Sequence, residues 1–380
     1  MNKYGVQYRS RTQVALEKRD KQQVFPLAGW VFDFPVDEVR IFLLDAVKKA
    51  NGINLHTGLN IISELRANSL EEAQETSKNF AETTLNLISF STLTSCSPAR
   101  LVSILNILDS DAETCPFMQY VYPFDEQEII GSLNVINEPT FREVFDAYTK
   151  SSNQRRILRA LSWLRKGIDE ENPVDEFVSY WIGLEVIKHI LRRNLKLKVK
   201  NVGEWDGVKD VFTNKLHCQD FDTIREAGRN GLLHGFRELD TKFIKEIESY
   251  VEPVRKTLIF SLGHILGLQD STILTITNKN PRRIRQKPWS VIKGALRNIP
   301  TDFDKLVQNY PRIDYEMTNK ELLLEGGELS IKVSVTHHFY GPSGAKWGIR
   351  ATELWGAKDS GIKQFTLDNI RIDKPSKSYE

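Results

Sequence analysis

Four amphipathic helical patterns follow one another between residues 153 and 266, and they constrain the fold more than any other feature of the chain. In each pattern apolar residues recur every three or four positions, which gives the predicted helix one apolar side. Helices joined by short links pack side by side as a bundle. We therefore expect residues 151–268 to form a four-helix bundle.

The apolar faces of these helices are carried by Ile157, Leu161, Leu164 and Ile168, then by Phe177, Tyr180, Trp181, Leu184, Ile187 and Leu191, then by a pattern from Phe221 to Leu233, and last by Ile247, Val251, Val254, Leu258 and Ile265. Asn172 and Pro173 predict the start of the second helix, because asparagine caps helices and proline suits their first position. Pro253 is expected to kink the fourth helix.

Residues 1–150 mix several patterns and are expected to form a mixed α/β domain without an assigned role. Gln23–Pro35 is rich in aromatic residues, Gly and Pro, which indicates strands and turns. Val36–Ala50 places apolar residues at helical spacing and is predicted as a helix. Two further helices are predicted within Leu70–Leu108, separated near Ser95–Pro98, and Glu113–Thr140 is predicted to be rich in loops.

Residues 269–380 are predicted as a linker from Gln269 that leads into a small β-containing unit. Leu322–Leu324 and Leu329–Val335 read as two strands around a turn at Glu325–Glu328, and Trp347–Trp355 as a further strand. The expected fold class is mainly α, and α+β overall. It combines a central helical bundle, a mixed N-terminal domain and this C-terminal unit.

Composition excludes several classes of protein. The chain has 52 Lys and Arg against 50 Asp and Glu, whereas a protein that binds nucleic acid through bulk charge is far more basic. The cysteines Cys96, Cys115 and Cys218 form no CxxC pair, which argues against a disulfide framework and a Cys-rich zinc site. The histidines form no HExxH motif, so we expect no metal and no cofactor.

The start of the chain shows no apolar leader. Its most apolar run, Thr257–Leu268, is shorter than the roughly 20 residues that a membrane span needs. We therefore expect a cytoplasmic protein that does not associate with membranes.

The third predicted helix ends in a group of chemically useful residues. Arg229 and Asn230 are followed by His234, with four residues between the arginine and the histidine. On a 3.6-residue period, Asn230 and His234 share one ridge, and Arg229 lies about 100° round from Asn230. Gly228 and Gly231 weaken the helix, but they leave room for a backbone or a phosphate to approach.

The four helical patterns together with the segment RNGLLHG resemble the HEPN superfamily, whose mark is Arg, four to six residues, then His, commonly with a polar residue after the arginine. Ile157–Ile187 also resembles the helix pair that precedes this motif in a bacterial subgroup, found among methylamine-utilisation-protein-like and abortive-infection-type proteins. The resemblance covers less than a third of the chain.

This resemblance implies a metal-independent endoribonuclease whose site is built by two protomers, in a toxin or antiphage-defence setting. His234 would act as general base or acid at the ribose 2′-hydroxyl, since the ordinary pKa of histidine suits proton transfer near neutral pH. Arg229 would hold the scissile phosphate, and Asn230 would orient it. The expected partners are RNA, a second copy of the chain and a regulatory or antitoxin-like protein.

Further residues are weaker candidates for a supporting or RNA-binding role. Glu185 stands in an otherwise apolar stretch and is a candidate to hold Arg229 or His234, or it is an exposed carboxylate. Two basic clusters could bind RNA backbone or simply face solvent, and they are Arg192, Arg193 and Lys196, and Arg282, Arg283 and Arg285. His234 and Gly235 could also serve only to end the helix, which leaves open a non-catalytic module for RNA or nucleotide binding or for dimerisation.

Overall fold

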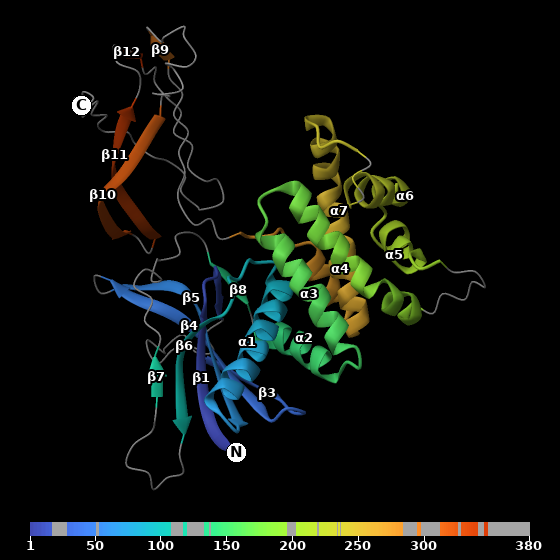
Figure 1. The fold of residues 1–380 in the computed structure, drawn as a ribbon, viewed down its shortest axis with the longest axis horizontal. Helices are drawn as coiled ribbons and strands as arrows, with labels where there is room; N and C mark the ends of the chain where they lie inside the picture. The colour runs from blue at the N-terminus through green and yellow to red at the C-terminus, as the bar shows by residue number, and fades with distance from the viewer. Residues whose placement is uncertain are drawn as a thin grey trace. The chain divides into compact units, whose positions relative to one another are not determined.

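The structure is a computed structural model. It describes residues 1–16, 29–50, 53–107, 117–119, 133–136, 138–195, 203–218, 220–233, 235, 237–283, 295–297, 312–325, 328–340 and 346–348. The chain divides into two compact units, Met1–Ile284 and Arg285–Glu380, drawn in Figure 1. The predicted domain boundaries after residues 150 and 268 stay predictions.

The first unit begins with a six-stranded antiparallel sheet in the order β3-β4-β5-β1-β6-β7. Its strands are β1 (Asn2–Ser10), β3 (Gly29–Phe34), β4 (Val39–Ala50), β5 (Ile53–Ala67), β6 (Arg100–Ile107) and β7 (Phe117–Gln119). Along β1, Tyr4, Val6 and Tyr8 are buried, and the residues between them are partly exposed. This alternation gives the sheet one apolar face.

Two of the predicted helices are strands. Val36–Ala50 contains β4, in which Val39, Ile41 and Leu43 are buried at every second position. The same run also fits helical spacing, and pairing with β3 and β5 decides in favour of a strand. The second helix predicted within Leu70–Leu108 is β6, which pairs with β1. A strand over Gly29–Phe34 agrees with the prediction for Gln23–Pro35.

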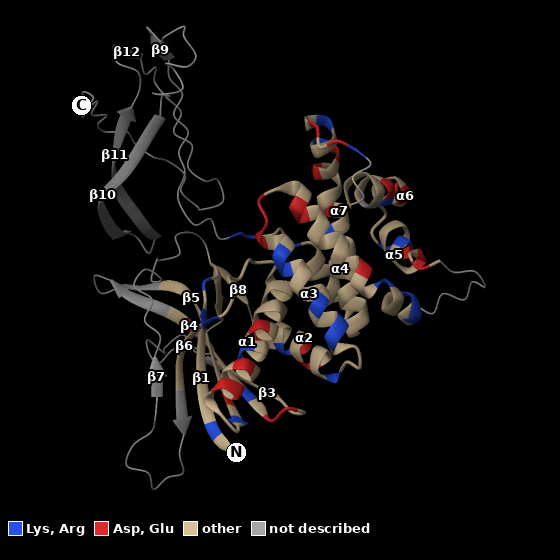
Figure 2. Ribbon diagram, in the orientation of Figure 1, with Lys and Arg blue, Asp and Glu red and all other residues tan. Residues whose placement is uncertain are grey.

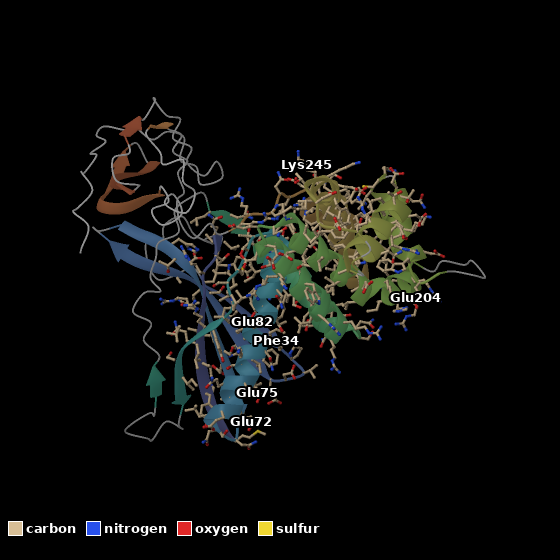
Figure 3. The ribbon with its side chains drawn as sticks, turned by 45° about the horizontal axis from the view of Figure 1, so that its top comes forward. Phe34, Glu72, Glu75, Glu82, Glu204 and Lys245 are labelled. Atoms are coloured by element: carbon tan, nitrogen blue, oxygen red, sulfur yellow. The ribbon has the colours of Figure 1, made fainter. Side chains whose placement is uncertain are left out.

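One long helix, α1 (Leu70–Thr92), lies against β1 and β5 on one side and against α3 on the other (Figure 1). Ser69 caps its start by accepting a hydrogen bond from the Glu72 N–H. Helix α2 (Glu138–Lys150) covers the β3 end of the sheet with aromatic side chains. There Phe34, which is labelled in Figure 3, packs between Phe80 and Phe145, with ring centroids 4.6 and 4.8 Å away.

The segment predicted as loop-rich, Glu113–Thr140, contains β7, the short strand β8 (Asn134–Ile136) and the first residues of α2. Strand β8 pairs in parallel with β2 (Val14–Leu16). This pairing ties two segments far apart in the sequence to each other.

Three long helices, α3 (Gln154–Asp169), α4 (Pro173–Asn194) and α7 (Thr241–Leu266), pack together and confirm three of the predicted helical patterns. Asn172 caps α4, since its Oδ1 accepts the Val174 N–H at 2.9 Å, and Pro173 is the first helical residue. Both assignments agree with the sequence. Pro253 lies inside α7, and the kink expected there stays a prediction.

The described residues between α4 and α7 form short helical pieces that pack on those two helices. They are α5 (Asp206–Asp210), a π-helical turn η1 (Val211–Lys215), α6 (Phe221–Arg225) and a second π-helical segment η2 (Glu226–Leu233). The predicted third helix is therefore helical throughout, but its second half is π-wound. After α7, the predicted linker is wrong over α8 (Asp270–Thr277), which packs on α7.

The second unit contains a long antiparallel pair, β10 (Arg312–Glu325) and β11 (Glu328–Tyr340), in which Glu325 is paired with Glu328. This pair confirms the two predicted strands, whereas Gly326 and Gly327 of the predicted turn lie outside the described residues. Strand β12 (Lys346–Gly348) pairs with β9 (Ala295–Arg297), and the remainder of the predicted strand at Trp347–Trp355 lies outside the described residues. No described helix has both the length and the apolar character that crossing a membrane requires.

Candidate functional site

The segment η2 carries the Arg229–Asn230 pair and packs closely against α4 and α7. A Cβ placed on Gly228 would lie 2.3 Å from Cζ of Phe177, and one on Gly231 would lie 3.1 Å from Cζ of Phe243. The room that these glycines leave is therefore filled by aromatic rings of the same chain, and not left for a phosphate.

Gly235 follows this segment and agrees with the alternative interpretation that it ends the helix. Its φ of 68° lies in the left-handed region that glycine adopts without strain. The Gly235 N–H donates to the Leu232 carbonyl at 3.3 Å, and the Arg237 N–H donates to the Gly231 carbonyl at 3.2 Å. Helix α7 follows directly, capped by Asp240, whose Oδ1 accepts the Phe243 N–H at 2.7 Å.

Of the three proposed catalytic residues, Asn230 is the one whose side chain is described. It is half-buried, and its Nδ2 donates to Oε2 of Glu226 at 2.6 Å. Arg229 has a described backbone within η2, but its side chain is not among those described, and His234 lies outside the described residues. Because η2 is π-wound, the angle of about 100° between Arg229 and Asn230, expected for an α-helix, does not apply there.

An ion pair lies beside the segment. The guanidinium of Arg237 donates to both carboxylate oxygens of Glu246, at 3.1 and 2.9 Å, and stands 3.9 Å from the centre of the Phe243 ring. The hydrogen bond from Arg237 lowers the pKa of Glu246 and raises the pKa of Arg237 itself. Both groups are therefore charged at neutral pH, and Arg237 is already engaged by an acid.

Glu185 is half-buried on α4. It follows Phe177 by eight residues, which is about 12 Å along a helix. The ring that contacts η2 and this carboxylate are therefore two turns apart. The side chains that Glu185 was proposed to hold are not described, so its supporting role stays a prediction.

The first basic cluster lies at the end of α4, where Arg192 is half-buried and Arg193 is exposed, and Lys196 lies outside the described residues. Exposed Arg155, Arg156 and Arg159 stand on the first turns of α3. Since α3 and α4 are joined by a three-residue link and pack together, these arginines gather near the same end of the pair (Figure 2). The run QRRILR at residues 154–159 is the sequence signal for the three arginines of α3.

The described members of the second basic cluster, Arg282 and Arg283, have different surroundings. Arg282 is exposed, and its backbone bonds with Leu93 and Ser95. Arg283 forms an ion pair with Glu176 and donates from Nε to the Ile168 carbonyl at 3.0 Å. Arg285 lies outside the described residues. Arg283 is thus engaged within the protein and does not offer a free charge to RNA.

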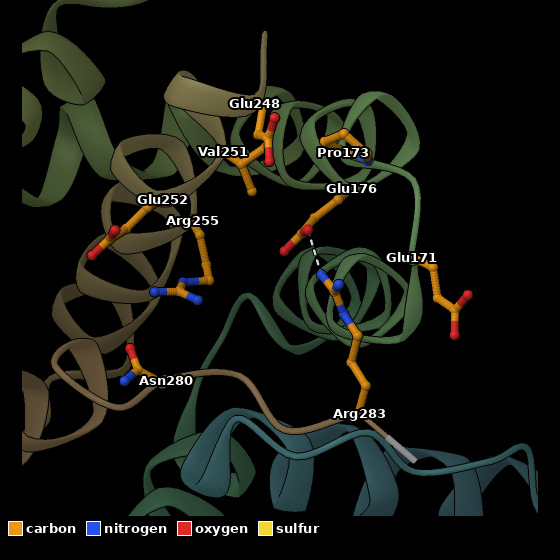
Figure 4. Close-up of a pocket in the computed structure, with 9 residues that line it drawn as sticks. All are labelled: Glu171, Pro173, Glu176, Glu248, Val251, Glu252, Arg255, Asn280 and Arg283. Carbon is orange, nitrogen blue, oxygen red and sulfur yellow. Dashed lines mark hydrogen bonds and ion pairs between the residues drawn. The ribbon is translucent and has the colours of Figure 1, made fainter. Parts of the chain in front are cut away.

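A cavity of about 270 Å³ lies beside this ion pair, and the sequence did not predict it. Its described lining consists of Glu171, Pro173, Glu176, Glu248, Val251, Glu252, Arg255, Asn280 and Arg283 (Figure 4). One signal was available. Arg255 falls on the apolar stripe of α7, one helical turn after Val251, where a charged side chain must be buried.

No three His, Cys, Asp or Glu side chains of the described residues lie close enough to hold a metal ion. Comparison of the chain with protein-family models, curated proteins and solved structures finds no match.

Proposed function

We propose that this protein is a metal-independent endoribonuclease of the HEPN type, in which Arg229, Asn230 and His234 act on the RNA backbone. The observation that carries the proposal is the place of the RNGLLHG segment. Its first five residues, Arg229–Leu233, form the end of the π-wound segment η2, which packs on α4 and α7. π-Helical turns are rare and are frequent at functional sites.

The proposed chemistry needs three tasks, and each residue type suits one of them. His234 takes the proton from the ribose 2′-hydroxyl, and the 2′-oxygen attacks the adjacent phosphorus. Arg229 binds the phosphate oxygens and stabilises the charge that grows on them. The bond to the 5′-oxygen then breaks, the 5′-oxygen takes a proton from water, and the proton on His234 returns to the solvent. The products are a 2′,3′-cyclic phosphate and a 5′-hydroxyl, so DNA, which lacks the nucleophile, is not cut.

Two protomers would bring two such segments together, as the resemblance implies, and the setting would be a toxin or antiphage system held in check by a partner protein. The exposed arginines near the α3–α4 end offer a surface for RNA phosphates. They lie toward the end of α4 opposite to Phe177, and η2 packs at Phe177. A bound RNA strand would therefore run along the helix pair.

Cleavage of labelled RNA in the presence of EDTA tests the proposal. We expect His234→Ala and Arg229→Ala to lower the cleavage rate by about 100-fold or more, as the loss of a general base or of an oxyanion-stabilising group does. The matched controls are His189→Ala, which removes an exposed histidine of α4, and Arg225→Ala on α6. Both should keep wild-type rates. Equal cutting by all five proteins would refute the assignment.

A non-catalytic role is the second candidate, and packing favours it. Gly228 and Gly231 accommodate Phe177 and Phe243, and Gly235 ends the segment. Packing and helix termination therefore explain why glycine stands at these three positions, without any catalytic role. In this case the wild-type protein binds RNA or dimerises without cutting RNA. RNA binding by gel shift and molar mass by light scattering, measured on the same samples, distinguish the two candidates.

A further inference from the structure

The cavity beside Glu176 lies between the start of α4, the middle of α7 and the chain that follows α8. Pro173 and Glu176 come from α4, and Glu248, Val251, Glu252 and Arg255 come from α7. Asn280 and Arg283 close it from the segment after α8 (Figure 4). Its described lining is mostly charged, with Pro173 and Val251 as the apolar members.

Arg255 is the buried cation of this cavity. The residue is 5% exposed, and Figure 4 shows its guanidinium on the side of Asn280. Its Nε is buried and has no hydrogen-bond partner among the described atoms. Burial lowers the pKa of Arg255, and Tyr180, Glu252 and Glu176 act in the opposite direction. A buried guanidinium without an acceptor is costly, and the cavity is the space in which an acceptor can sit.

Two other carboxylates of the lining already have partners, the buried Glu176 and the exposed Glu252. Glu176 is paired with Arg283 and also accepts a hydrogen bond from the Tyr180 hydroxyl at 3.0 Å. Glu252 is paired with Lys256 at 2.8 Å. Inside the cavity, therefore, Arg255 is left as the cation without a paired acid among the described residues, and it favours an anionic group.

The outer part of the cavity has the opposite charge. Glu171 and Glu248 are exposed, and neither forms an ion pair with a described residue. In Figure 4 they lie on the side of the cavity away from Asn280. Glu248 precedes Arg255 by two helical turns, which is about 10 Å along α7. A plain dianion such as phosphate would meet this acidic rim unfavourably, whereas a molecule with a cationic end would be attracted.

From this arrangement we propose that the cavity binds a small amino acid with a cationic side chain, whose carboxylate pairs with Arg255 and whose amine faces Glu248 and Glu171. A carboxylate matches the two parallel N–H donors of a guanidinium. The volume of about 270 Å³ suits a single compact molecule rather than a polymer segment. This proposal does not depend on ribonuclease activity.

Isothermal titration calorimetry of the full chain with L-lysine tests the proposal. Two derivatives of L-lysine serve as matched probes. L-Lysinamide lacks the carboxylate, and Nα,Nε-diacetyl-L-lysine lacks both cations. We expect L-lysine to bind with a Kd of about 1 mM or tighter, and each derivative to bind at least about tenfold more weakly. No heat with L-lysine, or tighter binding of acetate or inorganic phosphate, would overturn the proposal.

Three variants locate the binding. Arg255→Met should bind L-lysine and L-lysinamide with the same affinity. Glu248→Gln should bind L-lysine at least about threefold more weakly than wild type. Lys245→Met removes an exposed cation of the same helix outside the cavity and should bind like wild type. Because an unpaired buried charge is removed, Arg255→Met should unfold at the wild-type Tm or above it. Unchanged L-lysine affinity in both Arg255→Met and Glu248→Gln would place the ligand elsewhere.

Discussion

The ring of Phe177 occupies the space that a side chain at position 228 would need, and it is held there by stacking on Trp181, with ring centroids 5.7 Å apart. Both aromatic residues are fully buried. Packing against Phe177 therefore explains why glycine stands at position 228. The sequence pattern could not reveal this, because Phe177 is about fifty residues away along the chain. A glycine in a helix indicates that something is close, but not what it is.

Gly228→Ala should lower the free energy of unfolding by about 1–3 kcal/mol, because the added methyl collides with a ring that cannot move away. The change would otherwise gain up to about 1 kcal/mol of helix propensity. Urea unfolding measures the effect. As a control, Phe177→Leu should reduce the cost of the added methyl, so that the double variant is less than additive. A more stable Gly228→Ala protein would contradict the packing.

His56 makes stability depend on pH. Its side chain is 7% exposed, its Nε2 lies 3.2 Å from the Thr12 carbonyl, and burial lowers its pKa. Asp45 faces it at 4.0 Å from Nδ1, too far for a hydrogen bond, and Oδ1 of Asp45 accepts the Leu16 N–H. The unfolded chain thus binds a proton more readily than the folded protein does.

The stabilisation from neutral His56 is fully present above the ordinary histidine pKa of about 6.5 and is lost as the pH falls below it toward the lowered pKa of the folded state. We expect Tm to fall as the pH is lowered below about 6.5, and His56→Gln to reduce this slope. His189→Gln, at an exposed site, should leave the slope as it is. An identical slope in all three proteins would show that another group is responsible.

At the scale of elements, the long helices could be predicted and several strands could not. Helices α3 and α4 carry repeated apolar faces over four or more turns, together with a recognisable start at Asn172 and Pro173. Strand β4 has an apolar run that fits both periods, and its pairing with β3 and β5 is not visible locally. The apolar spacing of Glu226–Leu233 also did not reveal the π winding of η2, since the same residues fit an ordinary helical period.

The cap of α4 gives a test at this scale. Asn172→Ala removes the acceptor for the Val174 N–H and should lower the free energy of unfolding by about 0.5–2 kcal/mol. Asn172→Asp keeps an acceptor at the same place and should stay close to wild type. Thermal unfolding followed by circular dichroism compares the three proteins. Equal losses in both variants would mean that the side-chain hydrogen bond is not what stabilises this end.

Across the first unit, Arg165 connects the packed helices to the sheet region. Its Nε donates to the Cys96 carbonyl at 2.8 Å, and its Nη2 donates to the Ser97 carbonyl at 2.8 Å. Its Nη1 pairs with Glu82 of α1 at 2.6 Å and also donates to Asn86. The sequence shows Arg165 only as a polar residue of α3, so this connection between helices and sheet could not be predicted from periodicity.

Arg165→Met should lower the free energy of unfolding by about 3 kcal/mol or more, since Oε2 of Glu82, Oδ1 of Asn86 and two backbone carbonyl groups lose this donor. Arg159→Met changes an exposed arginine of the same helix and should cost no more than about 0.5 kcal/mol. Urea unfolding, followed by both tryptophan fluorescence and circular dichroism, measures both. A small loss in Arg165→Met would mean that the two parts are held together mainly by apolar contacts.

The position of β1 inside the sheet has a consequence for synthesis on the ribosome. Both neighbours of β1 come later in the chain, β5 ending at Ala67 and β6 ending at Ile107. At about 5–20 residues per second, β1 waits several seconds before both of its edges can be paired. During that interval its backbone donors and acceptors are open to any other extended chain. The nascent protein is therefore most exposed to mispairing before β6 emerges, and slower translation would lengthen that exposure.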